Sequence, residues 1–190
     1  MILYLIIIFA GMLLITLSHV IFASGFYVSH GLLHLIMTVV VGVVFIFVID
    51  MIVSAIVMVL PKACYKPFTK VFRWEKKFYN KIKIKSWKDY IPIGRGPIFI
   101  GMKKDSVYNP KDQGYLTKLI DECYRAEMMH FFSQFLGFLL LLLMPVEVVL
   151  SISLPIAIIN MILQYLPFIV QRYNIPKLQM LYERNKRHSA

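Results

Sequence analysis

The sequence predicts an all-α integral membrane protein with four transmembrane helices and a basic cytoplasmic loop. Hydrophobic residues make up 59% of the 190 positions and the mean hydropathy is +0.70, above the values usual for soluble domains. Only 16% of the residues are charged, too few for a polar shell around a soluble core. The positive charge is also segregated: 16 of the 21 Lys and Arg fall within residues 62–125, the other five follow Gln171, and residues 1–61 have none.

Residues 1–60 predict the first two transmembrane helices. Residues 2–23 and 33–60 are apolar stretches that can cross about 30 Å of hydrocarbon at about 1.5 Å per residue. The short uncharged segment 24–30 between them is expected to be an external loop. Residues 1–23 lack a basic start and are followed by a second apolar stretch, which favours a retained helix over a cleaved signal peptide.

Residues 61–129 are the sizeable aqueous part. Pro61 and Pro67 are expected to end the second helix. Residues 66–81 then predict a basic amphipathic helix lying in the membrane interface, with lysines and arginines spread away from its apolar face. Residues 82–85, Ile-Lys-Ile-Lys, alternate with a period of two, a weak indication of a short strand. The apolar face comprises Phe68, Val71, Phe72, Phe78 and Tyr79.

The C-terminal part predicts a helix that begins near Gln113 and continues into the third span. Residues 131–149 and 152–170 predict a close hairpin of the third and fourth spans within segment 130–171. Residues 172–190 form a tail. Because basic loops face the cytoplasm and the number of spans is even, both termini are expected on the cytoplasmic side.

The net charge of +11 could suggest nucleic-acid binding. The basic block is bounded by apolar helices, however, and this arrangement favours anionic lipid headgroups as its partner and no nucleic acid. No phosphate-binding loop, nucleophile elbow or dinucleotide fingerprint is present, so no bound cofactor is expected. Cys64 and Cys123 both fall in the predicted cytoplasmic part, where no disulfide is expected.

The strongest candidate for chemistry lies where the third span begins. Glu127 and His130 are three residues apart and therefore neighbours on one helical face, which they share with apolar residues. A carboxylate beside an imidazole can orient a general base that deprotonates a hydroxyl. The alternative is a polar pair that satisfies itself at the interface. Arg125 points nearly the opposite way, and a surface ion pair with Asp121 is its default interpretation.

A second cluster lies at the inner end of the fourth span. Gln171, Arg172, Tyr173 and Asn174 could bind a phosphate or a lipid headgroup, or could anchor the helix in the interface. Three further residues of the basic segment have acidic, aromatic or basic side chains. Taken alone, they are interpreted as solvated or interfacial. These residues are Glu75, Trp87 and Lys88.

Asp50 is an ionisable residue inside a predicted span, where it needs a partner. Asn160 or Gln164 could supply one, and helix packing could be its whole function. Three histidines lie in the same half of the chain, two of them four residues apart, a spacing that can bind a metal. No carboxylate or cysteine is close to them in sequence, so polar interfacial residues are favoured and no metal site is predicted. These histidines are His19, His30 and His34.

Four motifs occur in a fixed order between residues 61 and 188. They are Phe-Arg-Trp-Glu-Lys at 72–76, Trp-Lys at 87–88, Arg-Ala-Glu-x-x-His at 125–130 and Val-Gln-Arg-Tyr-Asn at 170–174. With them the chain resembles the glycosyl-4,4'-diaponeurosporenoate acyltransferase family, bacterial membrane enzymes of staphylococcal carotenoid synthesis. The chain departs from that pattern by holding two predicted spans before residue 61.

The resemblance implies a multi-pass protein of the bacterial plasma membrane that transfers a fatty acyl group to a sugar hydroxyl of a glycosylated lipid. It implies an acyl donor such as acyl-CoA, and a membrane lipid or glycolipid as acceptor. It supports His130 as general base and Glu127 as the group that holds its tautomer. The substrate-binding residues it implies or supports are Glu75, Trp87, Lys88, Arg125, Gln171, Arg172, Tyr173 and Asn174.

Acyl transfer to a lipid-linked hydroxyl is therefore the preferred function, with Arg125 or Arg172 binding donor phosphates or the developing oxyanion. An apolar groove between spans would hold the acyl or polyprenoid tail. Two alternatives remain open at this point. One is a lipid-modifying enzyme that transfers another group, and the other is a non-catalytic lipid carrier or membrane assembly subunit.

Overall fold

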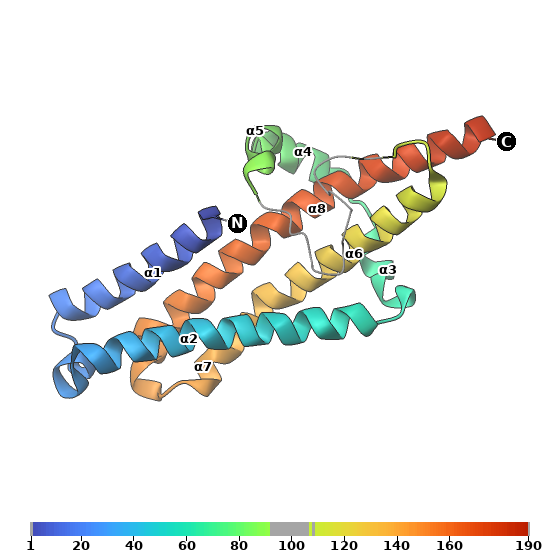
Figure 1. Cartoon of the computed structure of the whole chain (residues 1–190). Coiled ribbons are helices and arrows are strands. Elements are labelled where there is room, and N and C mark those ends of the chain that lie inside the picture. Colours follow the sequence, from blue (N-terminus) through green and yellow to red (C-terminus); the bar gives the residue numbers. More distant parts are fainter. Residues whose placement is uncertain (1, 92–106, 108, 190) are drawn as a thin grey trace. The chain divides into compact units, whose positions relative to one another are not determined.

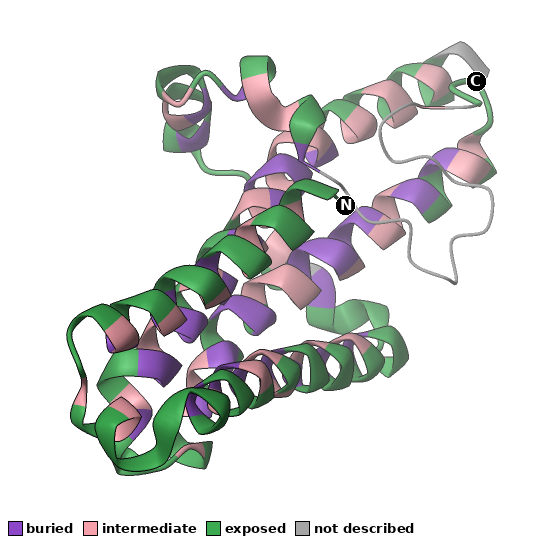
Figure 2. Ribbon diagram, turned by 60° about the vertical axis from the view of Figure 1, so that its left-hand side comes forward, coloured by how far each residue is buried: buried purple, intermediate pink, exposed green. Residues whose placement is uncertain are grey.

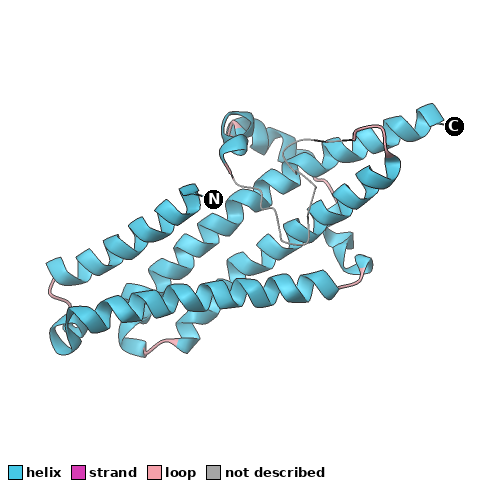
Figure 3. Ribbon diagram, in the orientation of Figure 1, coloured by secondary structure: helices cyan, strands magenta, loops and turns pink. Residues whose placement is uncertain are grey.

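The computed structural model describes residues 2–91, 107 and 109–189, with the side chains of Lys66, His188 and Ser189 left out. Its regular elements are helices, and those described residues contain no strand (Figure 3). The chain divides into two compact units. Unit 1 comprises Met1–Ala55 and Phe132–Tyr165, and unit 2 comprises Ile56–Phe131 and Leu166–Ala190. Each unit is described by itself.

Four helical segments are long and apolar enough to cross a membrane, which confirms the predicted fold class (Figure 1). The first two are α1 (Ile2–Ile21) and α2 (Gly25–Val59). The third, Gln113–Leu143, joins α6 (Gln113–Leu136), η3 (Gly137–Leu139) and α7 (Leu140–Leu143). The fourth, Val146–Arg187, contains η4 (Val146–Val148), the π-helical η5 (Val149–Ser153) and most of α8 (Leu154–Ser189).

The outer faces of these helices are apolar. Phe9, Leu14 and Leu142 are exposed by 65%, 67% and 81% of their surface, and exposed residues line the spans in Figure 2. Large apolar patches are avoided by soluble monomers because they cost free energy in water. Exposure of this kind along helices of spanning length is what lipid chains would cover.

Unit 1 is packed closely around the first half of α8. Its buried core contains Leu35 and Val39 of α2 together with Leu140 and Ile152. Small residues allow the helices to approach: a Cβ on Gly42 would lie 2.9 Å from Ile156 Cδ1, and one on Gly137 would lie 2.6 Å from the amide nitrogen of Asn160. Such small contact residues are typical of helix pairs in membranes.

The start of the second span differs from the prediction. The segment 24–30 was expected to be a loop, but α2 already begins at Gly25. Gly31 interrupts the helix with φ 78° and ψ 173°, a conformation that a residue without a Cβ adopts at little cost. The short segment is therefore a helical turn set at an angle to the span.

The amphipathic segment also differs from the prediction of one helix over residues 66–81. It divides into α3 (Lys66–Thr69) and α4 (Arg73–Lys81), because the chain is extended from Lys70 to Phe72, and η1 (Lys62–Tyr65) precedes it. The weakly indicated strand at 82–85 is absent: Lys83 is left-handed with φ 49°, and α5 (Ile84–Trp87) and η2 (Lys88–Tyr90) follow. The predicted start of the third helical segment at Gln113 is confirmed, and Asp112 Oδ1 caps it by accepting from the backbone N–H of Tyr115 at 3.0 Å.

Asp50 and the three histidines make contacts within unit 1. Asp50 Oδ2 accepts a hydrogen bond from Gln164 Nε2 at 2.5 Å, so Gln164 is confirmed as a partner. The rings of His30 and His34 stack with centroids 5.1 Å apart, and His19 Nδ1 lies 2.6 Å from Ser24 Oγ. No group of three or more potential metal ligands gathers among the residues that the structure describes.

Candidate functional site

A buried ion cluster in unit 2 is centred on the guanidinium group of Arg172 in α8. The Nε–H donates to Glu75 Oε2 at 3.2 Å, and Nη1 donates to Glu127 Oε1 at 2.9 Å and to the carbonyl of Phe68 at 2.6 Å. Nη2 donates to Glu75 Oε1 at 2.8 Å and to the carbonyl of Lys70. A guanidinium group has five N–H donors, and all five are used.

The extended segment from Lys70 to Phe72 explains how this site forms. Its conformation leaves the carbonyl of Lys70 outside any helix, where it can accept from Arg172. The Phe72 ring lies with its centroid 5.9 Å from Arg172 Cζ and covers the guanidinium group. A single helix over residues 66–81 would have used this backbone internally, so the break in the amphipathic segment is part of the site.

Glu75 is fully satisfied by its surroundings. It occupies the third position of α4, where Oε1 accepts from the backbone N–H of Phe72 at 2.9 Å in the manner of a capping box. Oε2 also accepts from the hydroxyl of Tyr79, one turn later, at 3.0 Å. Burial, followed by the negative charge of Glu75, raises the pKa of the Tyr79 hydroxyl, which keeps it a donor. Together with Arg172, Glu75 therefore accepts four hydrogen bonds.

Glu127 shares Arg172 as its partner, but one of its carboxylate oxygens accepts no hydrogen bond among the described residues. It is fully buried, and its side chain has 1% relative exposure against 12% for Arg172. Oε1 is held by Arg172, whereas Oε2 is buried and has no hydrogen-bond partner among the described residues. A buried oxygen without a partner is costly and calls for an explanation. Glu127 is thus the carboxyl of the cluster with capacity for a proton or a further hydrogen bond.

The charges within the cluster do not cancel when both carboxyl groups are ionised. Glu75 and Glu127 would carry two negative charges against the single positive charge of Arg172. Both carboxyl groups therefore depend on the same guanidinium group for a positive partner. Glu75 accepts four hydrogen bonds, whereas Oε2 of Glu127 is open to a further one.

His130 follows Glu127 by three residues on α6 and is half-buried. The neighbouring Phe131 packs edge-on against Phe68 and tilted against Phe168, with ring centroids 5.5 Å and 5.9 Å apart. Aromatic rings thus pack around the position that follows His130 on α6. Within the predicted pair Glu127 is buried and His130 half-buried, and the partner of Glu127 that the structure identifies is Arg172.

Arg125 contacts residues other than those of the ion cluster. Its Nε–H donates to the hydroxyl of Tyr65 at 2.8 Å, and Nη1 lies 4.0 Å from Glu122 Oε1. The default pairing with Asp121 is wrong, because Asp121 pairs with Lys62. These interactions fasten η1 to α6, which gives Arg125 a structural role near the base of the loop.

The other predicted site residues differ in the contacts that they make. Tyr173 stacks edge-on against Tyr79 at 5.4 Å, with the ammonium group of Lys177 3.4 Å from the Tyr173 ring centroid. Trp87 packs against a buried apolar cluster and donates from Nε1 to the carbonyl of Ile82 at 2.8 Å. The cluster consists of Tyr79, Ile84 and Ile169. Gln171 is buried with its Nε2 unpaired among the described residues. Asn174 is half-buried, and Lys88 pairs with its neighbour Asp89.

Sequence reasoning missed the residues that complete the cluster. Tyr79 was assigned only to an apolar face, although its spacing of four from Glu75 places the two side chains together on a helix. The carbonyls of Phe68 and Lys70 could not be found, because backbone acceptors leave no signal in the sequence. Outside the cluster, the hydrogen bond from Gln179 to the hydroxyl of Tyr124, at 2.5 Å, was also missed, for lack of any motif.

These observations define a polytopic α-helical membrane protein in which α4 is joined to the third and fourth spanning segments by a buried carboxylate–guanidinium cluster. Residues 61–184 match the glycosyl-4,4'-diaponeurosporenoate acyltransferase family, and because the match covers well over half of the chain, the protein belongs to this family. It is accordingly an acyltransferase. The matched residues include Glu75, Glu127, His130 and Arg172. Neither a curated protein nor a solved structure matches the chain.

Proposed function

We propose that the protein transfers a fatty acyl group from a donor such as acyl-CoA to a sugar hydroxyl of a glycosylated, carotenoid-type lipid. The family supports both the reaction and the type of acceptor. The single observation that carries the location of the chemistry is the open Oε2 of Glu127, buried beside a saturated Arg172 and one helical turn before His130.

In this proposal His130 accepts the proton of the attacking sugar hydroxyl. The hydroxyl oxygen forms a bond to the acyl carbonyl carbon, and the resulting tetrahedral intermediate expels the donor thiolate. His130 then returns its proton to the thiolate. Glu127 stabilises the charged imidazole and holds its tautomer through the oxygen that Arg172 leaves open.

Arg172 receives a different role from the one that the sequence suggests. A guanidinium group that binds a donor phosphate or an oxyanion needs free N–H donors, and all five N–H groups of Arg172 are engaged within unit 2. We therefore assign Arg172 as a positioning residue that fixes Glu127. The exposed lysines of α4, Lys76 and Lys77, remain available for donor phosphates and anionic headgroups.

The cytoplasmic orientation of the loop follows from its charge and stays part of the proposal. Acyl-CoA is a cytosolic donor, so a site on the cytoplasmic face would meet it without transport. A plasma membrane location of a bacterial cell agrees with the acceptor.

Mass spectrometry of lipids tests the proposed product. Cells that make the glycosylated acceptor should gain, on expression of the protein, a species heavier by one fatty acyl group less one hydrogen. The His130→Ala variant should form none of it, whereas His34→Ala, the same change at an exposed histidine of α2, should form the normal amount. A different added mass would identify another transferred group, and normal product from His130→Ala would remove the assigned base.

A further inference from the structure

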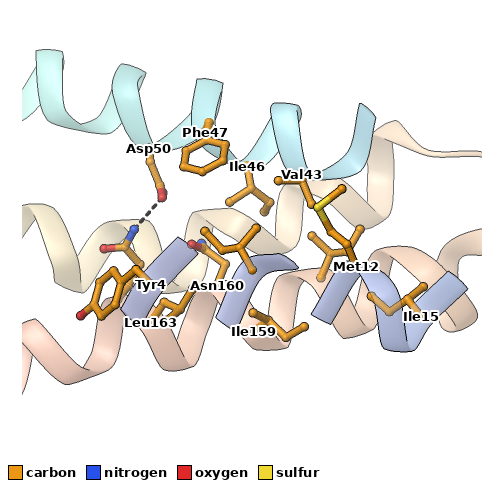
Figure 4. A pocket seen from close by; sticks show the side chains of 13 residues that line it. Tyr4, Met12, Ile15, Val43, Ile46, Phe47, Asp50, Ile159, Asn160 and Leu163 are labelled. Carbon is orange, nitrogen blue, oxygen red and sulfur yellow. Dashed lines mark hydrogen bonds between the residues drawn. The ribbon is translucent and has the colours of Figure 1, made fainter. Parts of the chain in front are cut away.

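Unit 1 contains a cavity of about 100 Å³ between α1, α2 and α8 (Figure 4). None of the residues that line it belongs to the ion cluster. One end is apolar and is lined by Met12, Ile15 and Val43, and the other end holds Asp50 with its hydrogen-bond partner Gln164. This space is smaller than the apolar cavity of about 150 Å³ that binds benzene, so it accommodates only a few carbons of a hydrocarbon chain.

Two polar atoms at the walls of this cavity are buried without a hydrogen-bond partner among the described residues. They are Asp50 Oδ1 and the hydroxyl oxygen of Tyr4. Gln164 occupies only the other oxygen of Asp50, at 2.5 Å. Inside a membrane span such an unpaired oxygen is expensive, because lipid chains offer no hydrogen bond. A ligand that supplies one would remove this cost.

We propose that this cavity binds a lipid alcohol, with its hydrocarbon chain beside Met12 and Val43 and its hydroxyl group against Asp50 Oδ1. A hydroxyl donates to an ionised carboxylate and accepts from a protonated one, so it fits Asp50 in either state. An ammonium group would fit only the ionised form, and a carbonyl only the protonated form. The proposal does not depend on the proposed acyl transfer, since none of these residues belongs to that site.

Photocrosslinking of the full-length protein in lipid nanodiscs tests the proposal. The probe is hexadecanol with a diazirine in its chain, and the matched probe is hexadecane with the same diazirine. We expect the alcohol to label the cavity-lining peptides about tenfold more than the alkane, the ratio that one net hydrogen bond of about 1.4 kcal/mol provides. Asp50→Leu should reduce labelling by the alcohol to the level of the alkane.

Two neighbouring positions on α2 give a matched pair that leaves Asp50 intact. Val43→Phe fills the cavity and should abolish labelling, whereas Val44→Phe, at a side chain 53% exposed, should leave it unchanged. If Asp50→Leu does not fold, this pair of variants still tests whether the probe binds in the cavity. The His130→Ala variant should be labelled like the wild type, so loss of acyl transfer and loss of lipid binding are distinguishable. Equal labelling by alcohol and alkane would mean that Asp50 does not recognise the hydroxyl group, and labelling that survives Val43→Phe would mean that the probe binds outside the cavity. Either result would overturn the proposal.

Discussion

Replacing Arg172 of α8 by methionine should strongly destabilise unit 2. The substitution keeps an unbranched side chain, shorter than that of arginine, but removes five hydrogen bonds at once and leaves the carboxyl groups of Glu75 and Glu127 buried without a positive charge. These side chains have relative exposures of only 3% and 1%. Removing one partner of a buried ion pair typically costs about 3–5 kcal/mol. The carbonyls of Phe68 and Lys70 lose a donor as well.

A thiol-reactive fluorophore can measure this loss on the protein in detergent. Cys123 is buried at 3% exposure and becomes reactive only when α6 opens, whereas exposed Cys64 should first be replaced by serine. For a chain of this size, 3–5 kcal/mol corresponds to a fall in melting temperature on the order of 10 °C. Arg73→Met, at an exposed arginine of α4, is the matched control and should change the melting temperature little.

Arg172→Lys should fall between these two variants. An ammonium group has three donors and no planar fork, so it cannot reach all the acceptors that surround the guanidinium group. If Arg172→Met melted within about 2 °C of the wild type, the buried cluster would not be a source of stability, and Arg172 would have to be available for another role.

Three further changes test single contacts. Tyr79→Phe removes one of the four donors to Glu75 and should lower the free energy of unfolding by about 1 kcal/mol in the same melting assay, and an unchanged value would refute the contact. Gly137→Ala places a Cβ 2.6 Å from the Asn160 amide and should cost about 1–3 kcal/mol, whereas Gly25→Ala, with nothing within 4 Å, should be tolerated. Glu127→Gln keeps an acceptor for Arg172 and should melt normally while transfer slows about tenfold or more; normal transfer would show that the second oxygen has no part in the chemistry.

The spanning helices could be predicted from the sequence because their signal is local. Runs of apolar residues over the length of a bilayer identify them without any knowledge of packing, and the need of Asp50 for a partner correctly pointed to Gln164. The turn before Gly31 was missed, since its short helix has neither length nor charge to reveal it.

The candidate site could be predicted only in part, because much of it depends on contacts between residues far apart in the sequence. The spacing of Glu127 and His130 is local and could be interpreted on one helix. Arg172, by contrast, reaches Glu75 across 97 positions of sequence, and two of its acceptors are backbone carbonyls. Spacing therefore indicated a free anion-binding arginine, whereas packing gives it carboxylate partners.

The rate of acyl transfer by purified His130→Ala protein in detergent, with a fluorescent acyl-CoA and the glycosylated acceptor, is the decisive measurement. General base catalysis contributes about 10²–10⁴-fold, so we expect the rate to fall by at least a hundredfold while the melting temperature stays near that of the wild type. His34→Ala should retain the full rate. A His130→Ala protein that folds and transfers the acyl group at the wild-type rate would contradict the assignment of the base and, with it, the place of the reaction beside Glu127.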